Sequence, residues 1–275
     1  MILRIGQIDY ANCFPIFTCL TGSSRCEDYV FIKGVPADLN KKLSSGHLDI
    51  CPSSSIEFAK HPQRYLILKN LSISSIGHVK SVFLFSRLPI EKLDGQTVGL
   101  TKESDTSINL LKIILQKFYN YHNSYTNISN SNINSLDDLK AILLIGDSAL
   151  KAGLHKSKDI YAYDLGDLWY RHTGLPFVFA LWILREDAAH NEKKSVSNLY
   201  AELCNAKQLA YRSYEKLAGI YGKKWIGKEE LINYWQTISY DLTPHHLEGL
   251  RKFYLYSTEL GLIENNPLIR LFPDL

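Results

Sequence analysis

Short hydroxyl and amide side chains follow three of the strands that the sequence predicts, at the point where each strand ends. In chain order these residues are Asn12, Ser53, Ser54, Ser55, Ser104, Thr106 and Ser107. In open α/β sheets, ligands bind beyond the carboxyl ends of the strands, where the next helices offer free N–H groups. The pattern therefore predicts a cradle for a carboxylate or phosphate, with the hydroxyls adding to the N–H donors. The alternative is that these residues serve only as helix N-caps.

Three further sets of polar residues carry weaker signals. Gly146 and Asp147 follow a predicted strand over residues 141–145, where a lone aspartate is more often a turn former or a cap than a catalytic group. Asp164 and Asp167 could form a carboxylate pair, but a spacing of three in a glycine-containing loop is weak evidence. His78 fits a core or surface position better than a site.

Composition excludes several classes of protein. Hydrophobic residues make up 45% of the 275 residues and charged residues 21%, which is ordinary for a folded chain that buries a core. A net charge of +3 is too small for binding along a nucleic-acid backbone. No apolar run approaches the roughly 20 residues that span a bilayer. The glycines form no phosphate-binding loop, and no G-x-S-x-G turn occurs.

The N-terminus and the cysteines indicate a cytoplasmic protein. Asp9 interrupts the first apolar stretch, so residues 1–9 do not read as a secretory signal. The five cysteines, Cys26 among them, include no Cys-x-x-Cys pair, and we expect them to be reduced. We expect no metal and no cofactor.

Strands and helices alternate with short loops, which predicts an α/β fold with a mainly parallel sheet. Two α/β units precede a helical C-terminal segment. Strands are predicted over residues 3–8, 48–51, 65–75, 80–86, 98–100, 141–145 and 178–185, and helices over 36–45, 56–60, 104–121, 195–220, 228–238 and 243–260. Pro36 should open its helix, and Thr243 should cap the last one. Residues 121–135, rich in Asn and Ser, should form a surface loop.

Four stretches resemble the menaquinone-biosynthesis family of the futalosine pathway: residues 4–15, 72–81, 145–150 and 173–182. The resemblance is spread over about residues 2–185. It implies a two-lobed fold like that of the type II periplasmic binding proteins, with a helical C-terminal segment and a ligand cleft between the lobes. Residues 1–86 and 185–275 would form the first lobe and residues 87–184 the second. The strands near 81–86 and 180–185 would be the crossing segments.

Within that family the chain most resembles the branch that dehydrates chorismate. A sibling branch forms dihydroxynaphthoate and uses a histidine where this chain has Ile145, Gly146 and Asp147. By resemblance, Asn12 and Ser81 would orient chorismate and stabilise charge or the leaving hydroxyl. The substrate's own enolpyruvyl carboxylate would take the proton, with Asp147 as the reserve acid or base.

The same resemblance assigns the polar clusters to the two carboxylates of chorismate. Ser53, Ser54, Ser55, Thr106, Ser107 and Gly146 would bind the substrate through hydroxyls and helix N-termini. The alternatives are the naphthoate-forming sibling enzyme and a solute-binding protein without catalytic activity. No nucleic acid or membrane is expected as a partner.

Overall fold

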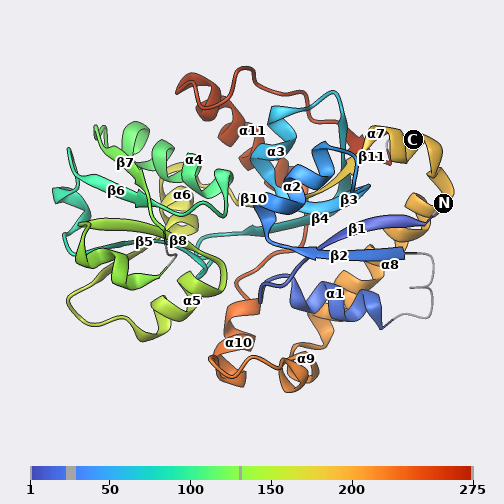
Figure 1. Cartoon of the computed structure of the whole chain (residues 1–275), viewed down its shortest axis with the longest axis horizontal. Coiled ribbons are helices and arrows are strands. Elements are labelled where there is room, and N and C mark those ends of the chain that lie inside the picture. Colours follow the sequence, from blue (N-terminus) through green and yellow to red (C-terminus); the bar gives the residue numbers. More distant parts are fainter. Residues whose placement is uncertain (1, 23–28, 130–131, 274–275) are drawn as a thin grey trace.

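The strands of the computed structural model form two separate sheets, which lie side by side along the long axis of the molecule (Figure 1). The structure describes residues 2–22, 29–129 and 132–273. Cys26 lies outside these ranges, and the other four cysteines are free thiols. No described helix is long and apolar enough to cross a membrane.

The first sheet has six strands in the order β11-β4-β10-β3-β1-β2. Their bounds are β1 (Leu3–Ile8), β2 (Tyr29–Gly34), β3 (Ile50–Ser54), β4 (Tyr65–Ser75), β10 (Phe177–Arg185) and β11 (Leu271–Phe272). Strand β1 runs parallel to β2 and β3, and β11 runs parallel to β4. Strand β10 is antiparallel to both of its neighbours, β3 and β4.

The second sheet has five strands in the order β7-β6-β8-β5-β9. Their bounds are β5 (Val82–Ser86), β6 (Thr97–Leu100), β7 (Ser124–Asn127), β8 (Ala141–Ile145) and β9 (Tyr161–Asp164). Strand β6 is parallel to β7 and β8, whereas β5 is antiparallel to β8 and β9. Both sheets are mixed, because in each one a single strand beside a crossing between the sheets, β10 or β5, runs against its neighbours. The other strands of each sheet share one direction, as the prediction of a mainly parallel sheet requires.

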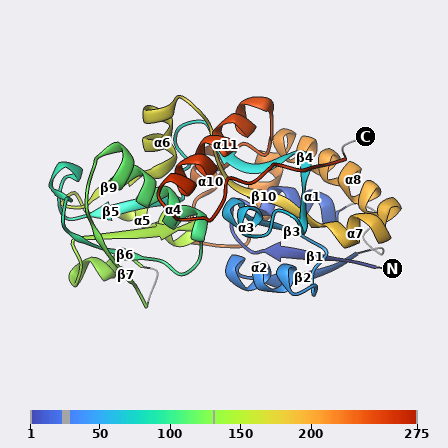
Figure 2. The same cartoon turned by 90° about the horizontal axis from the view of Figure 1, so that it is seen from above.

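Helices cover both faces of each sheet (Figures 1 and 2). Those of the first sheet are α1 (Phe14–Thr21), α2 (Pro36–Ser44), α3 (Ser55–Lys60), α7 (Glu186–Asn191), α8 (Lys193–Arg212), α9 (Tyr214–Ile220), α10 (Lys228–Trp235) and α11 (Pro244–Glu259). Those of the second are α4 (Asp105–Ile113), α5 (Gly146–His155) and α6 (Leu165–Thr173). Helix α11 packs on β10 and also contacts α3 and α4, so the C-terminal segment touches both halves.

The chain crosses between the sheets twice. The first crossing segment, residues 76–81, joins β4 to β5, and the second, residues 165–176, joins β9 to β10 and includes α6. The lobe boundaries expected from the sequence, at residues 86 and 185, lie after these crossings, at the ends of β5 and β10. All of β5 pairs within the second sheet and all of β10 within the first, so both boundaries belong before these strands. We therefore propose a division into two lobes at these two crossings. They replace the crossings expected in the strands at 81–86 and 180–185.

Several predicted elements differ in extent. Strand β3 continues through Pro52 to Ser54, so two of the three serines belong to the strand instead of following it. The helix expected over 104–121 ends at Ile113 and continues as a π-helical turn, Ile114–Phe118. The expected loop at 121–135 contains β7 and a 3₁₀ turn, Ile133–Asp137. A further 3₁₀ turn, Ile90–Lys92, precedes β6.

Other local predictions are confirmed. Pro36 opens α2, and Thr243 caps α11, accepting a hydrogen bond from the N–H of His246 while Pro244 occupies the first turn. The helical segment predicted over 195–220 is present, although Ser213 divides it into α8 and α9.

Candidate active site

A narrow cavity with an open mouth lies between the two sheets. Its walls come from the turn after β1, the end of β3, the first crossing segment, β10, and the N-termini of α2, α4 and α5. Five of the nine predicted site residues line it, namely Asn12, Ser54, Ser81, Ser107 and Gly146. Residues far apart in sequence thus meet in one place, as expected for a cleft at the carboxyl ends of strands.

Asn12 lies in the turn between β1 and α1. Its side-chain oxygen is buried and has no hydrogen-bond partner among the described residues. Its main-chain carbonyl accepts a hydrogen bond of 2.8 Å from the hydroxyl of Tyr240. The amide oxygen on the cavity wall therefore remains free to accept a hydrogen bond from a molecule in the cavity.

Ser81 ends the first crossing segment and is buried against the cavity. Its carbonyl accepts a hydrogen bond of 2.8 Å from the N–H of Gly146, which ties the start of β5 to the first residue of α5. Gly146 has a φ of +60°, and a Cβ there would lie 3.1 Å from the ring of Tyr10. This position therefore favours glycine, because other residues rarely adopt this φ and an added Cβ would crowd the ring of Tyr10.

The N-terminus of α4 contributes two serines. Ser104 is the N-cap of this helix and accepts a hydrogen bond of 3.3 Å from the N–H of Ser107, so the capping interpretation of Ser104 is confirmed. The two hydroxyls also lie 3.3 Å apart, and both residues line the cavity. Capping and exposure to the cavity therefore occur together.

Ser53, Ser55 and Thr106 are not part of the described cavity wall. Ser53 is buried within β3, opposite Leu181 of β10. Thr106 accepts a hydrogen bond of 2.9 Å from the N–H of Ile56 and lies 3.3 Å from the hydroxyl of Ser55. Ser55 and Thr106 thus join α3 beside the first sheet to α4 beside the second.

Asp147 also lies outside the cavity wall. One carboxylate oxygen accepts a hydrogen bond of 2.9 Å from the N–H of Ala11, and the other lies 3.0 Å from the amine of Lys223. The carboxylate links α5 to the turn after β1 and to the C-terminal segment. These contacts suit a bridging role better than that of a reserve acid or base in the cleft.

Asp164 and His78 lie beside the first crossing segment. The carboxylate of Asp164 is buried and accepts hydrogen bonds from the N–H groups of Val79 and Lys80. His78 is mostly exposed and lies 3.7 Å from Asp164 and 3.6 Å from Asp167. None of these three ionisable residues lines the cavity.

Sequence reasoning missed two cavity residues, Tyr10 and Cys13, although both lie beside Asn12 in the chain. The hydroxyl of Tyr10 donates a hydrogen bond of 2.8 Å to Glu103, which joins the turn after β1 to the loop before α4. Burial raises the pKa of the Cys13 thiol well above its usual range, so this sulfur stays protonated near neutral pH. Cys13 is therefore an apolar wall residue and not a thiolate nucleophile.

A family model described as menaquinone biosynthesis matches residues 3–259. The chain belongs to this menaquinone-biosynthesis family. It is 32% identical over 200 residues to the chorismate dehydratase of Thermus thermophilus, covering 66% of this chain and 70% of that protein. It is 33% identical over 180 residues to the chorismate dehydratase of Campylobacter jejuni, covering 64% of each.

The fold also resembles that of a solved binding protein. The periplasmic aliphatic sulphonate binding protein of Escherichia coli matches with a TM-score of 0.69 at 13% identity, over 97% of this chain and 94% of that one. The predicted periplasmic-binding-protein-like fold is thus confirmed. At this level of identity the likeness concerns the fold alone.

The described residues that line the cavity of this menaquinone-biosynthesis protein carry no charged side chain. No Asp, Glu, Lys, Arg or His is among the lining residues, which are apolar side chains, hydroxyls, one amide and one thiol. Nor do the described residues include a group of three or more His, Cys, Asp or Glu side chains that could hold a metal ion. The wall can bind a polar ligand through neutral donors and through the positive ends of α4 and α5.

Proposed function

We propose that this protein is a chorismate dehydratase, a hydro-lyase that converts chorismate to 3-[(1-carboxyvinyl)oxy]benzoate and water in menaquinone biosynthesis. Relatives that are 32–33% identical to this chain over about two thirds of its length carry the name chorismate dehydratase. The observation that carries the proposal is that Asn12, whose amide oxygen has no hydrogen-bond partner among the described residues, lines the same cavity as Ser81.

The neutral wall suits a substrate with two carboxylates. The first turns of α4 and α5 face the cavity at Ser104, Ser107 and Gly146, and each helix end places partial positive charge there. A hydrogen bond to a charged group contributes about 1.5–3 kcal/mol. Several such bonds can hold a dianion without a lysine or arginine, and the hydroxyl of Ser54 adds a further donor.

The elimination needs little beyond positioning. One C–H bond and one C–O bond of the ring break, the ring becomes aromatic, and the proton and hydroxide leave as water. We propose that Ser81 and Asn12 orient the substrate and hydrogen-bond the departing hydroxyl, so that the wall contributes geometry and electrostatic stabilisation. The enolpyruvyl carboxylate of the substrate itself would accept the proton, since Asp147 already binds Ala11 and Lys223.

The test is to incubate the purified protein separately with chorismate and with cyclic dehypoxanthinyl futalosine and to identify any product by mass. The proposal predicts loss of one water from chorismate and no change in the second compound. Formation of dihydroxynaphthoate would support the sibling enzyme instead. Binding of either compound without turnover would support a solute-binding protein.

A further inference from the structure

The end of α10 and the turn after it, residues 234–240, lie directly behind the proposed active site. This 234–240 segment is held to the first sheet, since the main chains of Ser239 and Ser74 exchange two hydrogen bonds of 2.8 and 2.9 Å. The N–H of Ser72 adds a third bond, of 3.0 Å, to the carbonyl of Tyr240. The segment is therefore a fixed part of the lobe.

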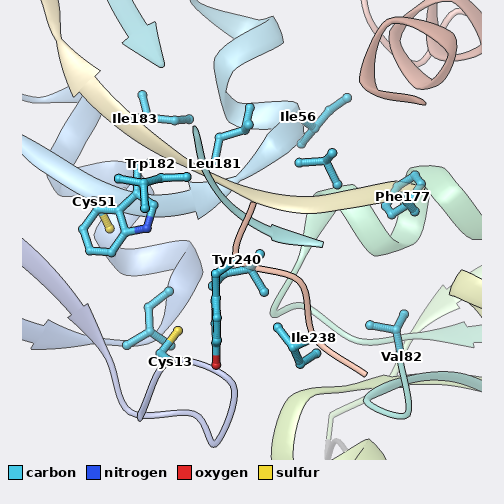
Figure 3. Packing of buried hydrophobic residues seen from close by; sticks show 14 of the residues in the cluster. Cys13, Cys51, Ile56, Val82, Phe177, Leu181, Trp182, Ile183, Ile238 and Tyr240 are labelled. Carbon is cyan, nitrogen blue, oxygen red and sulfur yellow. The ribbon is translucent and has the colours of Figure 1, made fainter. Parts of the chain in front are cut away.

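The same segment holds the turn that carries Asn12. The hydroxyl of Tyr240 donates a hydrogen bond of 2.8 Å to the carbonyl of Asn12, and the indole N–H of Trp235 donates one of 2.7 Å to the carbonyl of Ala11. Both donors belong to fully buried side chains. Figure 3 shows Tyr240 in this core, between Cys13 and Ile238 in the view. The carbonyls of Ala11 and Asn12, which are consecutive in the turn after β1, are thus both hydrogen-bonded by buried side chains of the 234–240 segment.

The other end of the segment reaches the first crossing segment. The hydroxyl of Thr237 lies 3.5 Å from the carbonyl of Val79, two residues before Ser81. The hydroxyl of Ser81 donates a hydrogen bond of 3.4 Å to the same carbonyl. The 234–240 segment therefore contacts both the turn at Asn12 and the crossing segment that ends at Ser81.

We propose that Tyr240 is a positioning residue that sets Asn12 in the cavity wall, so that the C-terminal helical segment completes the active site. This inference rests on the proposed function. A buried phenol hydroxyl is costly unless it is paired, and the hydroxyl of Tyr240 is paired to the carbonyl of a residue proposed to act on the substrate. Small displacements of such residues reduce turnover strongly, because the reaction depends on orientation.

The test is a double-mutant cycle in kcat, Tyr240→Phe with Asn12→Ala. Tyr240→Phe alone should lower kcat about tenfold or more with a smaller change in KM. In the Asn12→Ala background, which lacks the amide side chain, the same substitution should have little further effect. An equal loss in both backgrounds would overturn the proposal, because it would show a general structural effect.

Tyr65→Phe is the matched control. Tyr65 is equally buried, and its hydroxyl lies 3.3 Å from Glu57, away from the cavity wall. This variant should keep wild-type kcat, and a tenfold loss here would show that removal of any buried hydroxyl disturbs the site.

Hydrogen exchange without substrate separates this proposal from the proposed function. Tyr240→Phe should speed amide exchange in residues 9–15, while Tyr65→Phe leaves exchange there unchanged. Unchanged exchange in residues 9–15 of Tyr240→Phe would overturn the positioning role even if the wild type dehydrates chorismate. Faster exchange in a protein that leaves chorismate unchanged would support that role while refuting the proposed function.

Discussion

The carboxylate of Asp164 joins the two segments that cross between the sheets, and its replacement by asparagine should be among the most damaging single changes. One oxygen accepts hydrogen bonds of 2.9 and 3.2 Å from the N–H groups of Gly166 and Asp167 at the start of α6. The other accepts bonds of 3.0 and 2.7 Å from Val79 and Lys80 in the first crossing segment. The side chain is only 4% exposed.

Asparagine retains one acceptor oxygen and presents an NH₂ group in place of the other. Either the start of α6 or the crossing segment then loses its acceptor, leaving two N–H donors without partners. Each unsatisfied buried donor costs about 1–3 kcal/mol, so Asp164→Asn should lower the free energy of unfolding by about 2–6 kcal/mol. Urea denaturation followed by circular dichroism measures this directly.

Asp167→Asn provides the control, because Asp167 lies in the same turn but pairs with the exposed Arg171 at a spacing of four. Its loss should cost only about 0.5 kcal/mol. If Asp164→Asn unfolds within about 1 kcal/mol of the wild type, or no lower than the control, the carboxylate does not hold the crossing as described.

Three further predictions concern other contacts. Burial lowers the pKa of His246 below its unfolded value of about 6.5, so the neutral ring contributes stability above that pH, and this stability is lost as the pH falls. His246→Gln should therefore flatten the dependence of the urea midpoint on pH between about pH 5 and 7. An unchanged pH dependence would refute the assignment. Thr106→Val removes the acceptor of the Ile56 N–H and should cost about 1–3 kcal/mol in urea unfolding, whereas equal stability would show that this contact does not matter. Asp147→Asn should leave the shape of the pH profile of kcat unchanged, and loss of one limb would restore Asp147 as an acid or base.

Local signals in the sequence predicted much of the fold. The Pro36 and Thr243 helix starts depend on neighbouring residues alone, and the structure contains both. The strand directions could not be read in this way, because the antiparallel course of β10 and β5 depends on pairing with strands far away in the chain. The sequence predicts that this strand ends at Cys51, because Pro52 and the serines after it resemble a turn. In the structure, pairing with β10 keeps Pro52, Ser53 and Ser54 extended as part of β3.

The site was predicted in outline and not in detail. Ser53 and Ser54 are adjacent in an extended strand, so their side chains point to opposite faces and only Ser54 reaches the cavity. Thr106 and Ser107 are adjacent on a helix, so they also diverge, and only Ser107 lines the cavity. Sequence spacing locates the cluster, but the face that each residue presents depends on the final extent of β3 and α4. The contacts of residues 234–240 carry no sequence motif and depend entirely on tertiary packing.

The most direct test of the account is the kcat for chorismate of Ser81→Ala against that of Ser257→Ala. Both serines are buried, and the hydroxyl of Ser257, on α11, has no partner among the described residues and lies away from the cavity wall. The account predicts that the wild type and Ser257→Ala form the aromatic product at similar rates, while Ser81→Ala loses at least about a hundredfold in kcat. Near-wild-type turnover by Ser81→Ala, with the same melting temperature, would contradict the proposed site.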